Sequence, residues 1–405
     1  ILQHAAVPIS MWEMPSQPVK AAISRNKEYI ACTTRNGDLC IWNIKTTKQL
    51  YTQTSERRTA SANLQFFADD EKLLHTTGST LRVIDLASPA TPLLDIQMES
   101  MIRAAVVDEN NELCLVGKRN GTVTLLNIES GKVIHRCEKH QDTVKSVAIS
   151  RKAGRFISAC ERGTTKLFDL QTGNLIHTVN QDENVNYVEF SPDGKKYLAA
   201  SDDNTMLILE SETGQPYSKK IRCSSNIQTA KFNHTGNKIA TGTSNSTVQI
   251  WDVETSMPLV PAMKHKNSIR SLEFKDDDTL LASSSTDHTT CVWDTQTGDA
   301  ICPPMPHSYI VENSFFIAGD CILTSCGDRM IRKWQLHPRP QSATNTKTET
   351  INTTFALSSN GSLLITGGTD GIVRISETKS HRPEPLLIDH GVEIKCLAVS
   401  ADHKM

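Results

Sequence analysis

The amino-acid sequence predicts an all-β protein in which one short unit is repeated along the whole chain. Each unit closes with a two-residue step, usually an apolar residue followed by a polar or acidic one. Nine such steps follow one another at intervals of 41 or 42 residues. A fixed period of this length indicates a repeat architecture. The nine steps are Trp42-Asn43, Ile84-Asp85, Leu126-Asn127, Phe168-Asp169, Leu209-Glu210, Trp251-Asp252, Trp293-Asp294, Trp334-Gln335 and Ser376-Glu377, and a tenth unit begins at Gly391.

The unit that closes at Trp293-Asp294 shows why four strands are expected in each repeat. Its first segment, Ile269–Phe274, alternates apolar and polar residues as a half-buried strand does. Further strands are expected at 280–285 and 290–293, and the turn Thr297-Gly298 opens a fourth, less regular one. Sibling turns carry glycine, for example Gly194, because glycine adopts positive φ at little steric cost. One four-stranded sheet cannot bury both its faces, so we expect the sheets to pack radially as the blades of a β-propeller.

The pairs Trp251-Asp252 and Trp293-Asp294 match the defining dipeptide of the WD40 family, which the sequence resembles over its whole length. The resemblance implies a buried, hydrogen-bonded set of His, Ser or Thr, Asp and Trp within a blade. Two units carry such a set, the first with His265, Ser283, Asp287 and Trp293, the second with His307, Thr324, Asp328 and Trp334. Units two to five lack the Trp, and unit two has Gly78 where the turn Asp would fall. We expect those blades to be less rigid.

The number of blades in the ring is the less secure part of the architecture. Seven blades are the commonest number in the family that the sequence resembles, and an N-terminal segment commonly completes the last blade. We therefore expect a seven-bladed propeller over residues 1–294, with residues 1–18 as its closing outer strand. Residues 295–405 would then begin a second, incomplete propeller. A ring of eight or nine blades is the alternative, because no insertion marks a boundary and the spacing is unbroken across the polar stretch 341–350.

A weaker resemblance concerns the segments 257–265 and 297–307, which are rich in Gly and Pro. They are similar to the fourth strands of bacterial WD-repeat arrays, which are often fused behind a serine/threonine kinase domain. This resemblance implies an alternative function as the sensing or docking region of a multidomain kinase.

The composition excludes several classes of protein. The net charge is -2 and no apolar run reaches the length of a membrane span, so we expect neither membrane insertion nor nucleic-acid binding. The eleven Cys form no CxxC pair and recur at equivalent repeat positions, which favours buried thiols in a reducing cytoplasm. The chain begins at Ile1 and stops inside a unit, so we interpret it as a fragment.

No catalytic or cofactor motif stands out. The sequence contains no GxxxxGK[ST] loop, no HExxH metal motif and no GxSxG elbow. We expect no enzymatic activity, no cofactor and no metal, and we interpret the acidic runs 202–203 and 276–278 as solvated turns. A propeller hydrolase or lyase would need His or carboxylate side chains that converge in the central channel, and the repeat-equivalent positions suggest none.

Two repeat positions point towards the face with which WD40 proteins usually grip peptides. One lies 23 residues before the closing step and the other lies seven residues before it. Basic residues at or beside these positions form the predicted binding arc, namely Arg35, Arg103, Arg119, Lys145, Arg162 and Arg270. Arginine presents paired donors to carboxylates and phosphates. We therefore expect a non-catalytic scaffold that holds protein partners by an acidic or phosphorylated peptide, and the alternative is a solvated loop face without a dedicated ligand.

Overall fold

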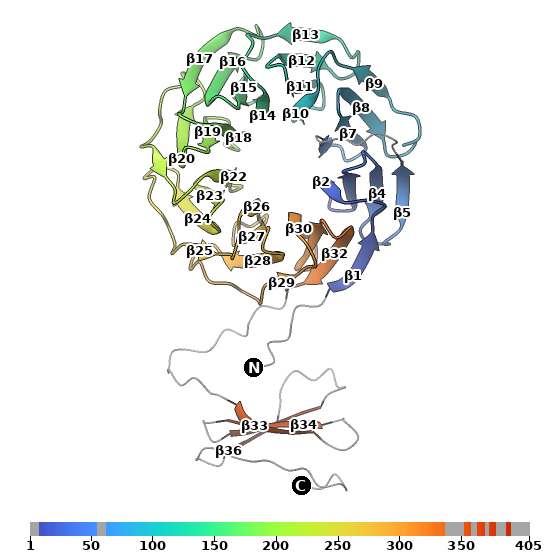
Figure 1. The fold of residues 1–405 in the computed structure, drawn as a ribbon, viewed down its shortest axis with the longest axis vertical. Helices are drawn as coiled ribbons and strands as arrows, with labels where there is room; N and C mark the ends of the chain where they lie inside the picture. The colour runs from blue at the N-terminus through green and yellow to red at the C-terminus, as the bar shows by residue number, and fades with distance from the viewer. Residues whose placement is uncertain are drawn as a thin grey trace. The chain divides into compact units, whose positions relative to one another are not determined.

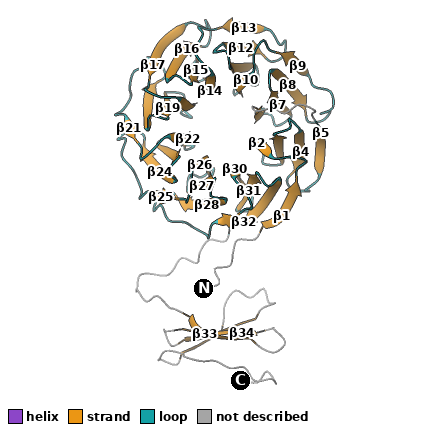
Figure 2. Ribbon diagram, in the orientation of Figure 1, coloured by secondary structure: helices purple, strands orange, loops and turns teal. Residues whose placement is uncertain are grey.

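The structure is a computed structural model that describes residues 8–54 and 62–336, together with four strands between residues 352 and 389. All regular secondary structure in these residues is β (Figure 2). The chain divides into a large unit, His4–Arg339, and a small unit that contains Pro340–Met405. No helix in the described part of the chain is long and apolar enough to cross a membrane.

The large unit is a ring of eight four-stranded antiparallel sheets around a central opening (Figure 1). In each of the first seven sheets the four strands follow one another in sequence, as the repeat predicts. Blades 1 to 4 are β2 (Pro18–Ile23), β3 (Tyr29–Thr34), β4 (Leu39–Asn43) and β5 (Gln49–Gln53); β6 (Ala62–Phe66), β7 (Lys72–Thr77), β8 (Thr80–Asp85) and β9 (Leu94–Gln97); β10 (Ile102–Val107), β11 (Leu113–Lys118), β12 (Val123–Asn127) and β13 (Val133–Arg136); and β14 (Val144–Ser150), β15 (Arg155–Cys160), β16 (Thr164–Asp169) and β17 (Leu175–Asn180).

The next three blades have the same strand order, but their fourth strands shrink to two residues. Blades 5 to 7 are β18 (Val185–Phe190), β19 (Lys196–Ser201), β20 (Thr205–Glu210) and β21 (Ile221–Arg222); β22 (Ile227–Phe232), β23 (Lys238–Thr243), β24 (Thr247–Asp252) and β25 (Met263–Lys264); and β26 (Ile269–Phe274), β27 (Leu280–Ser285), β28 (Thr289–Asp294) and β29 (Met305–Pro306). Proline in these outer segments cannot donate a ladder hydrogen bond, which shortens the strands.

The N-terminal strand closes the ring. Blade 8 contains β30 (Val311–Ile317), β31 (Cys321–Cys326) and β32 (Met330–Gln335), and its outer strand is β1 (Pro8–Glu13). β1 pairs antiparallel with β32, so the two ends of the large unit are joined by a strand ladder (Figure 1). Because the first strand of the chain completes the last blade, this ladder closes the ring.

The ring therefore contains eight blades, and the expected seven-bladed ring over residues 1–294 is wrong. β29 to β32, which follow Asp294, belong to the same ring as the strands before it. The physical reason is that blades of the same length can form rings with different numbers of blades. The spacing between repeats therefore does not determine how many blades the ring contains. The small unit is one separate sheet, with β33 (Asn352–Leu357), β34 (Leu363–Gly368), β35 (Ile372–Glu377) and β36 (Leu386–Asp389) in sequence order.

The hydrophobic core lies between the blades. Eight buried clusters occur among the described residues, one at each interface between neighbouring blades. At the closing interface, Trp12 of β1 and Ile331 of β32 pack with Cys32, Cys40 and Trp42 of blade 1. The thiols of Cys32 and Cys40 are free, and burial raises their pKa above the usual range. These cysteines therefore act as small core residues.

Blade 7 contains the complete hydrogen-bonded set that the WD40 resemblance implies. Ser283 Oγ lies 2.7 Å from His265 Nε2 and accepts a hydrogen bond from Trp293 Nε1, also at 2.7 Å. His265 Nδ1 lies 3.0 Å from Asp287 Oδ2. Burial would raise the pKa of Asp287, but the hydrogen bonds from His265 and neighbouring groups hold it well below its usual range. The set ties strands β27 and β28 to the segment that precedes β26.

Blade 8 carries the same residue types but connects them differently. His307 Nε2 lies 2.8 Å from Thr324 Oγ1, which also accepts a hydrogen bond from Trp334 Nε1 at 2.9 Å. Asp328 forms an ion pair with Arg332 at 2.6 Å, and His307 Nδ1 lies 3.0 Å from the carbonyl of Met305. The expectation of a four-membered set in this blade is therefore wrong.

Blade 6 retains part of the set. Trp251 Nε1 donates to Thr241 Oγ1 at 2.8 Å, and Asp252 accepts hydrogen bonds from the backbone and hydroxyl of Thr255 at 2.7 Å each. Asp252, the last residue of β24, thus stabilises the turn that follows its strand, as Asp169 and Asp294 do in blades 4 and 7.

Candidate functional site

The two repeat positions that predict a binding surface lie next to each other at one end of the ring, which we call the entry face. The entry face comprises the second residue of each first strand and the turn between the second and third strands. In blade 1 and in blades 3 to 8 the backbone N–H of the turn residue donates to the carbonyl just before the first strand. This bond measures 2.7 Å from Arg35 to Gln17 and 2.8 Å from Arg119 to Met101.

A β-bulge recurs on the entry face at the second residue of the first strand. The register shifts there in seven of the eight blades, and β6 of blade 2 is the exception. A bulge locally rotates a strand and redirects the side chain of the extra residue. The redirected residues are Val19, Arg103, Lys145, Asn186, Gln228, Arg270 and Glu312. This ring of bulge residues positions the side chains that border the central opening.

Three of the six predicted basic residues are held by neighbouring side chains. Lys145 Nζ donates to Asn186 Oδ1 at 3.1 Å, and Arg162 Nε lies 3.3 Å from Asp142 Oδ2. Arg270 contacts Glu312 Oε2 through Nη2 at 3.0 Å and through Nε at 3.2 Å. The two carboxylates neutralise Arg162 and Arg270, whereas Asn186 holds Lys145 without cancelling its charge, so the net charge of the arc is smaller than the sequence suggests.

Arg35, Arg103 and Arg119 keep their guanidinium groups available. Arg35 and Arg119 are exposed and Arg103 is half-buried, and none forms a side-chain hydrogen bond or ion pair with another residue in the described part of the chain. Arg103 and Arg119 both belong to blade 3, whereas Arg35 belongs to blade 1. An unpaired guanidinium can bind a carboxylate or a phosphate through two parallel hydrogen bonds.

A pocket of about 350 Å³ brings two of the predicted arginines together beside an aromatic ring. Arg35 and Arg270 line it with Glu312 and Tyr309. The Tyr309 ring is 46% exposed and stacks on His288, with ring centroids 5.8 Å apart. A side chain at Gly327 would lie 2.5 Å from this ring, so the absence of a Cβ there lets Tyr309 lie against the turn. The repeat pattern does not single out Tyr309, because this residue lies two residues before the repeat position.

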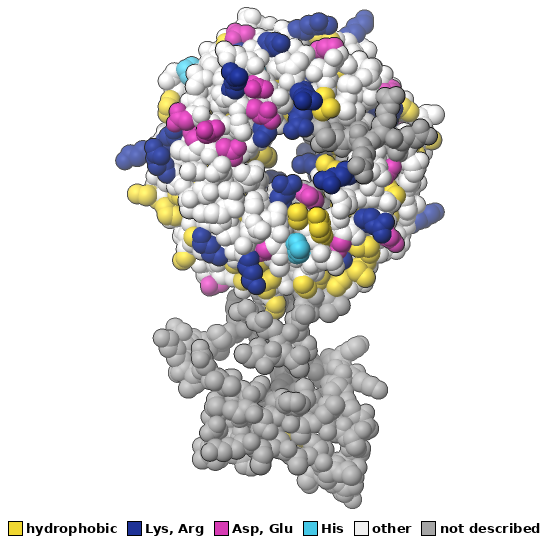
Figure 3. All heavy atoms as spheres, viewed as in Figure 1, with side chains coloured by type: hydrophobic (Ala, Val, Ile, Leu, Met, Phe, Trp, Pro, Cys, Tyr) yellow, Lys and Arg dark blue, Asp and Glu magenta, His cyan; other side chains and the backbone are white. Residues whose placement is uncertain are grey.

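The rest of the entry face has a different character. Asp202 Oδ1 accepts hydrogen bonds from Asn186 Nδ2 at 2.6 Å and from Gln228 Nε2 at 3.3 Å. Figure 3 shows one face of the ring, on which Lys and Arg side chains border part of the central opening and Asp and Glu side chains gather on a neighbouring part. A ligand that spans the opening would therefore meet one basic and one acidic sector.

The central channel contains a charged cluster that the repeat analysis missed. Lys231 Nζ lies 2.6 Å from Glu273 Oε2, and Glu189 Oε2 accepts the backbone N–H of Phe232 at 2.8 Å. Burial raises the pKa of Glu189 to about 7, although Lys231 opposes the rise. The three residues occupy one position of the first strand in blades 5, 6 and 7. The expectation that repeat-equivalent positions bring no carboxylates together in the channel is therefore wrong. The sequence comparison covered only the two entry-face positions and not the position that these three residues share.

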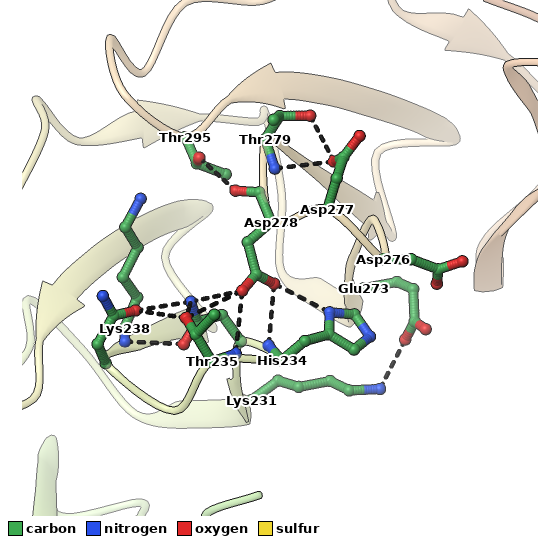
Figure 4. Close-up of polar contacts among 12 residues, drawn as sticks. Lys231, His234, Thr235, Lys238, Glu273, Asp276, Asp277, Asp278, Thr279 and Thr295 are labelled. Atoms are coloured by element: carbon green, nitrogen blue, oxygen red, sulfur yellow. Dashed lines mark hydrogen bonds and ion pairs between the residues drawn. The ribbon is translucent and has the colours of Figure 1, made fainter.

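The acidic turn of blade 7 binds the neighbouring blade and shows no cation site. Figure 4 shows Asp278, whose carboxylate accepts the backbone N–H groups of His234 at 2.9 Å and Thr235 at 3.0 Å. Asp277 accepts the backbone N–H of Thr279 at 3.0 Å, and Asp276 pairs with a lysine of blade 1. Among the residues that the structure describes, no group of three or more His, Cys, Asp or Glu could hold a metal ion.

Comparison with protein families identifies two matching models. The model described as "Nucleolar protein 10-like, N-terminal domain" matches residues 12–328, which span nearly the whole ring. The model described as "WD domain, G-beta repeat" matches residues 344–375 in the small unit. The WD40 resemblance is therefore confirmed.

Individual relatives are more distant. The chain is similar to eukaryotic translation initiation factor 3 subunit I from Danio rerio (27% identical over 185 residues, 43% of this chain and 56% of the relative). The match to the Homo sapiens protein is 24% identical over 185 residues, with the same coverage. The chain thus spans about half the length of the curated relatives it matches. Among solved structures, the computationally designed Ika8 protein aligns with a TM-score of 0.71 at 20% identity, covering 82% of this chain and 99% of the designed one. That likeness shows the fold alone.

Proposed function

We propose a function from the premise that the chain belongs to the nucleolar protein 10-like family of WD40 propellers. Its ring acts as a non-catalytic scaffold that holds a partner protein at the entry face. The observation that carries this proposal is the set of guanidinium groups of Arg35, Arg103 and Arg119, which no described side chain neutralises. A rigid propeller positions such loop residues while its strands stay unchanged.

The ligand that best fits these residues is an acidic or phosphorylated peptide segment. Carboxylates and phosphates accept the paired donors of arginine, and an extended segment can reach guanidiniums on separate blades. The pocket beside Arg35 adds the exposed Tyr309 ring, which offers an apolar surface to a neighbouring side chain of the same peptide. Charge and shape together would orient the segment across the basic sector.

Fluorescence anisotropy with a short labelled Asp/Glu-rich peptide, and with its phosphoserine counterpart, tests the proposal. The double variant Arg103→Glu/Arg119→Glu should weaken binding by at least about tenfold, equivalent to about 1.4 kcal/mol. A matched control is Lys132→Glu, since Lys132 is an exposed lysine on the turn at the other end of β12. Equal affinity for both variants and the wild type would contradict the proposal.

The titles of the relatives support a place in a larger assembly. Those proteins are named subunits of a translation initiation factor, and we propose that this chain likewise works as one subunit among several. Co-purification of a tagged chain at low and high salt tests this, because an electrostatic contact should weaken as salt rises. We found no observation that favours the alternative of a region attached to a kinase.

The compartment is also a proposal. Described cysteines such as Cys32, Cys40 and Cys114 carry free thiols, which fits the reducing environment expected of the cytoplasm. The nucleolus named in the family description is equally reducing. Imaging of a tagged chain in living cells would distinguish the two locations.

A further inference from the structure

A second pocket lies at the opposite end of the ring, between blades 4 and 5. It has a volume of about 730 Å³ and is lined by the turns that follow β14, β18 and β20. The entry-face residues of these blades lie at the start of the first strands β14 and β18, whereas the pocket lies beyond the ends of these strands. The two sites are therefore separate. Four basic side chains line the pocket, namely Lys152, Arg155, Lys195 and Lys196, against two acidic ones, Glu210 and Glu212.

Lys152 is a departure from the turn residues of several blades. At the same distance from the closing step, blades 1, 5 and 7 have Asn26, Asp193 and Asp277, each of which accepts a backbone N–H two residues further on, at 2.9 to 3.0 Å. The turn of blade 4 instead ends at Gly154, whose N–H donates to the carbonyl of Arg151, so no acceptor is needed at Lys152. Lys152 is exposed, and its Nζ donates to the carbonyl of Pro192 in blade 5 at 2.7 Å.

Ser211 is the second departure. The residue directly after the closing step is buried and apolar in other blades, for example Ile44, Ile128 and Val253. In blade 7 it is Thr295, whose hydroxyl donates to the carbonyl of Asp278 at 2.7 Å. In blade 5 it is Ser211, which is 3% exposed, lines the pocket, and has a hydroxyl without any hydrogen-bond partner. A buried hydroxyl without a partner costs about 1–3 kcal/mol, so a ligand that accepts its hydrogen bond would remove this cost.

The remaining side chains of the pocket are arranged for an anion. Arg155 Nη1 is held by Asp169 at 2.8 Å, while its buried Nε–H has no partner. Lys196 Nζ lies 4.4 Å from the centroid of the Tyr217 ring, which holds the ammonium group at the pocket wall. Glu210 Oε2 accepts a hydrogen bond from Thr213 Oγ1 at 3.0 Å, which uses part of its acceptor capacity. The donors therefore outnumber the acceptors that remain available.

We propose that this pocket binds a phosphate monoester. Lys152, Lys195 and Lys196 neutralise its charge, and the Ser211 hydroxyl donates a hydrogen bond to one phosphate oxygen. The phosphate could belong to a free small molecule or to a phosphorylated side chain of another protein, because the same donors serve both. This inference is independent of the peptide proposed for the entry face.

Isothermal titration calorimetry with O-phosphoserine, with a phosphoserine-containing peptide, and with the unphosphorylated forms of each tests the proposal. The wild type should bind both phosphorylated probes and neither control. If only the peptide binds, the source is a phosphorylated protein; comparable binding of free O-phosphoserine assigns a small molecule. Each titration is repeated in Arg103→Glu/Arg119→Glu, because a phosphoserine peptide would also bind the entry face. Binding that persists in this variant belongs to the pocket between blades 4 and 5, and phosphate binding that disappears with it would overturn the proposal.

Two variants change the pocket without altering a strand and so should fold normally. Lys152→Asn removes an ammonium group from an exposed turn, and Ser211→Val gives blade 5 the apolar residue of blade 6. Each should weaken phosphate binding by at least about fivefold, while the melting temperature of Ser211→Val stays equal or rises because an unpaired buried hydroxyl is removed. Lys196→Gln should also weaken binding, whereas Lys238→Gln, at the equivalent position of blade 6, should not.

Failure of both phosphorylated probes to bind the wild type would overturn the proposal. So would unchanged affinity in Lys152→Asn and Ser211→Val, because the phosphate would then lie elsewhere.

Discussion

Blades 7 and 8 carry the same set of residue types, yet the sets are connected in different ways. In blade 7, Asp287 lies 3.0 Å from His265 Nδ1, whereas in blade 8 Asp328 pairs with Arg332 and leaves His307 to a backbone carbonyl. The position of Arg332 on the third strand is occupied by Cys291 in blade 7. One substitution outside the set therefore decides where the aspartate binds. The shared residue types therefore predict where the His, Asp and Trp lie in each blade. The charge of Arg332 determines which group the Asp of blade 8 binds.

The largest expected effect comes from Asp328→Ala in blade 8. Arg332 has a side chain that is 11% exposed, so loss of its partner leaves a nearly buried charge without compensation. We expect a loss of about 3–5 kcal/mol in the free energy of unfolding, measured by denaturant titration. The double variant Asp328→Ala/Arg332→Met should recover most of that loss. If it stays as unstable as the single variant, the ion pair is not what Asp328 contributes.

A smaller effect is expected from Ser283→Ala in blade 7. The change leaves Trp293 Nε1 and His265 Nε2 without the oxygen that both contact at 2.7 Å. We expect a loss of about 2 kcal/mol, since buried polar groups are left unpaired. Ser284→Ala, in the same strand, is the control, because the buried hydroxyl of Ser284 has only a long contact of 3.4 Å with Thr290 Oγ1. An equal loss in the control would show that the strand, and not the hydrogen-bonded set, is sensitive to substitution.

The stability of the ring should depend on pH through His307 of blade 8. Burial and the nearby Arg332 lower the pKa of His307 to about 4. The unfolded chain, with an ordinary histidine pKa of about 6.5, binds more protons between pH 6.5 and 4, so stability should fall as the pH is lowered through this window. The fall attributable to His307 should reach up to about 3 kcal/mol. In His307→Gln the slope of stability against pH should become shallower, and an unchanged slope would contradict the assignment.

The smallest and most specific effect concerns Arg332→Cys, which gives blade 8 the residue of blade 7. Removal of the positive charge should raise the pKa of His307 above about 4 and let Asp328 approach its Nδ1. NMR titration of the histidine ring measures this directly. A pKa that stays the same or falls would show that Arg332 does not divert Asp328.

Much of the fold could be predicted from the sequence, because turn residues and alternation repeat with a constant period. The strands expected at 269–274 and 280–285 coincide with β26 and β27. The size of the ring could not be predicted, since closure depends on the angle between packed sheets and no residue marks it. The fourth strands were also hard to place, because Pro303 and Pro304 interrupt the ladder in blade 7 between the isolated bridge at Ala300 and the strand Met305–Pro306.

The candidate site was only partly predictable. The positions of Arg35, Arg103 and Arg119 followed from repeat spacing, but their freedom from partners did not. The sequence comparison did not identify Glu312, which neutralises Arg270. Blade 8 has one residue fewer before Trp334, so counting 23 residues back from the closing step does not reach the bulge residue. The channel cluster of Glu189, Lys231 and Glu273 would have been found if alternate residues of each first strand had been aligned. Partners on adjacent blades lie some 42 residues apart, as Lys231 and Glu273 do, and are invisible to local patterns.

The account depends most on electrostatic recognition at the entry face, and a charge-swap experiment tests it directly. An acidic peptide that binds the wild type should lose affinity for Arg103→Glu/Arg119→Glu, and a peptide with its acidic residues replaced by lysine should bind that variant and not the wild type. Anisotropy measured with both peptides against both proteins gives the full cycle. Restored affinity in the swapped pair is the predicted result. Loss of both peptides by the variant without rescue, or unchanged binding of the acidic peptide, would contradict the assignment of the basic arc as the partner site.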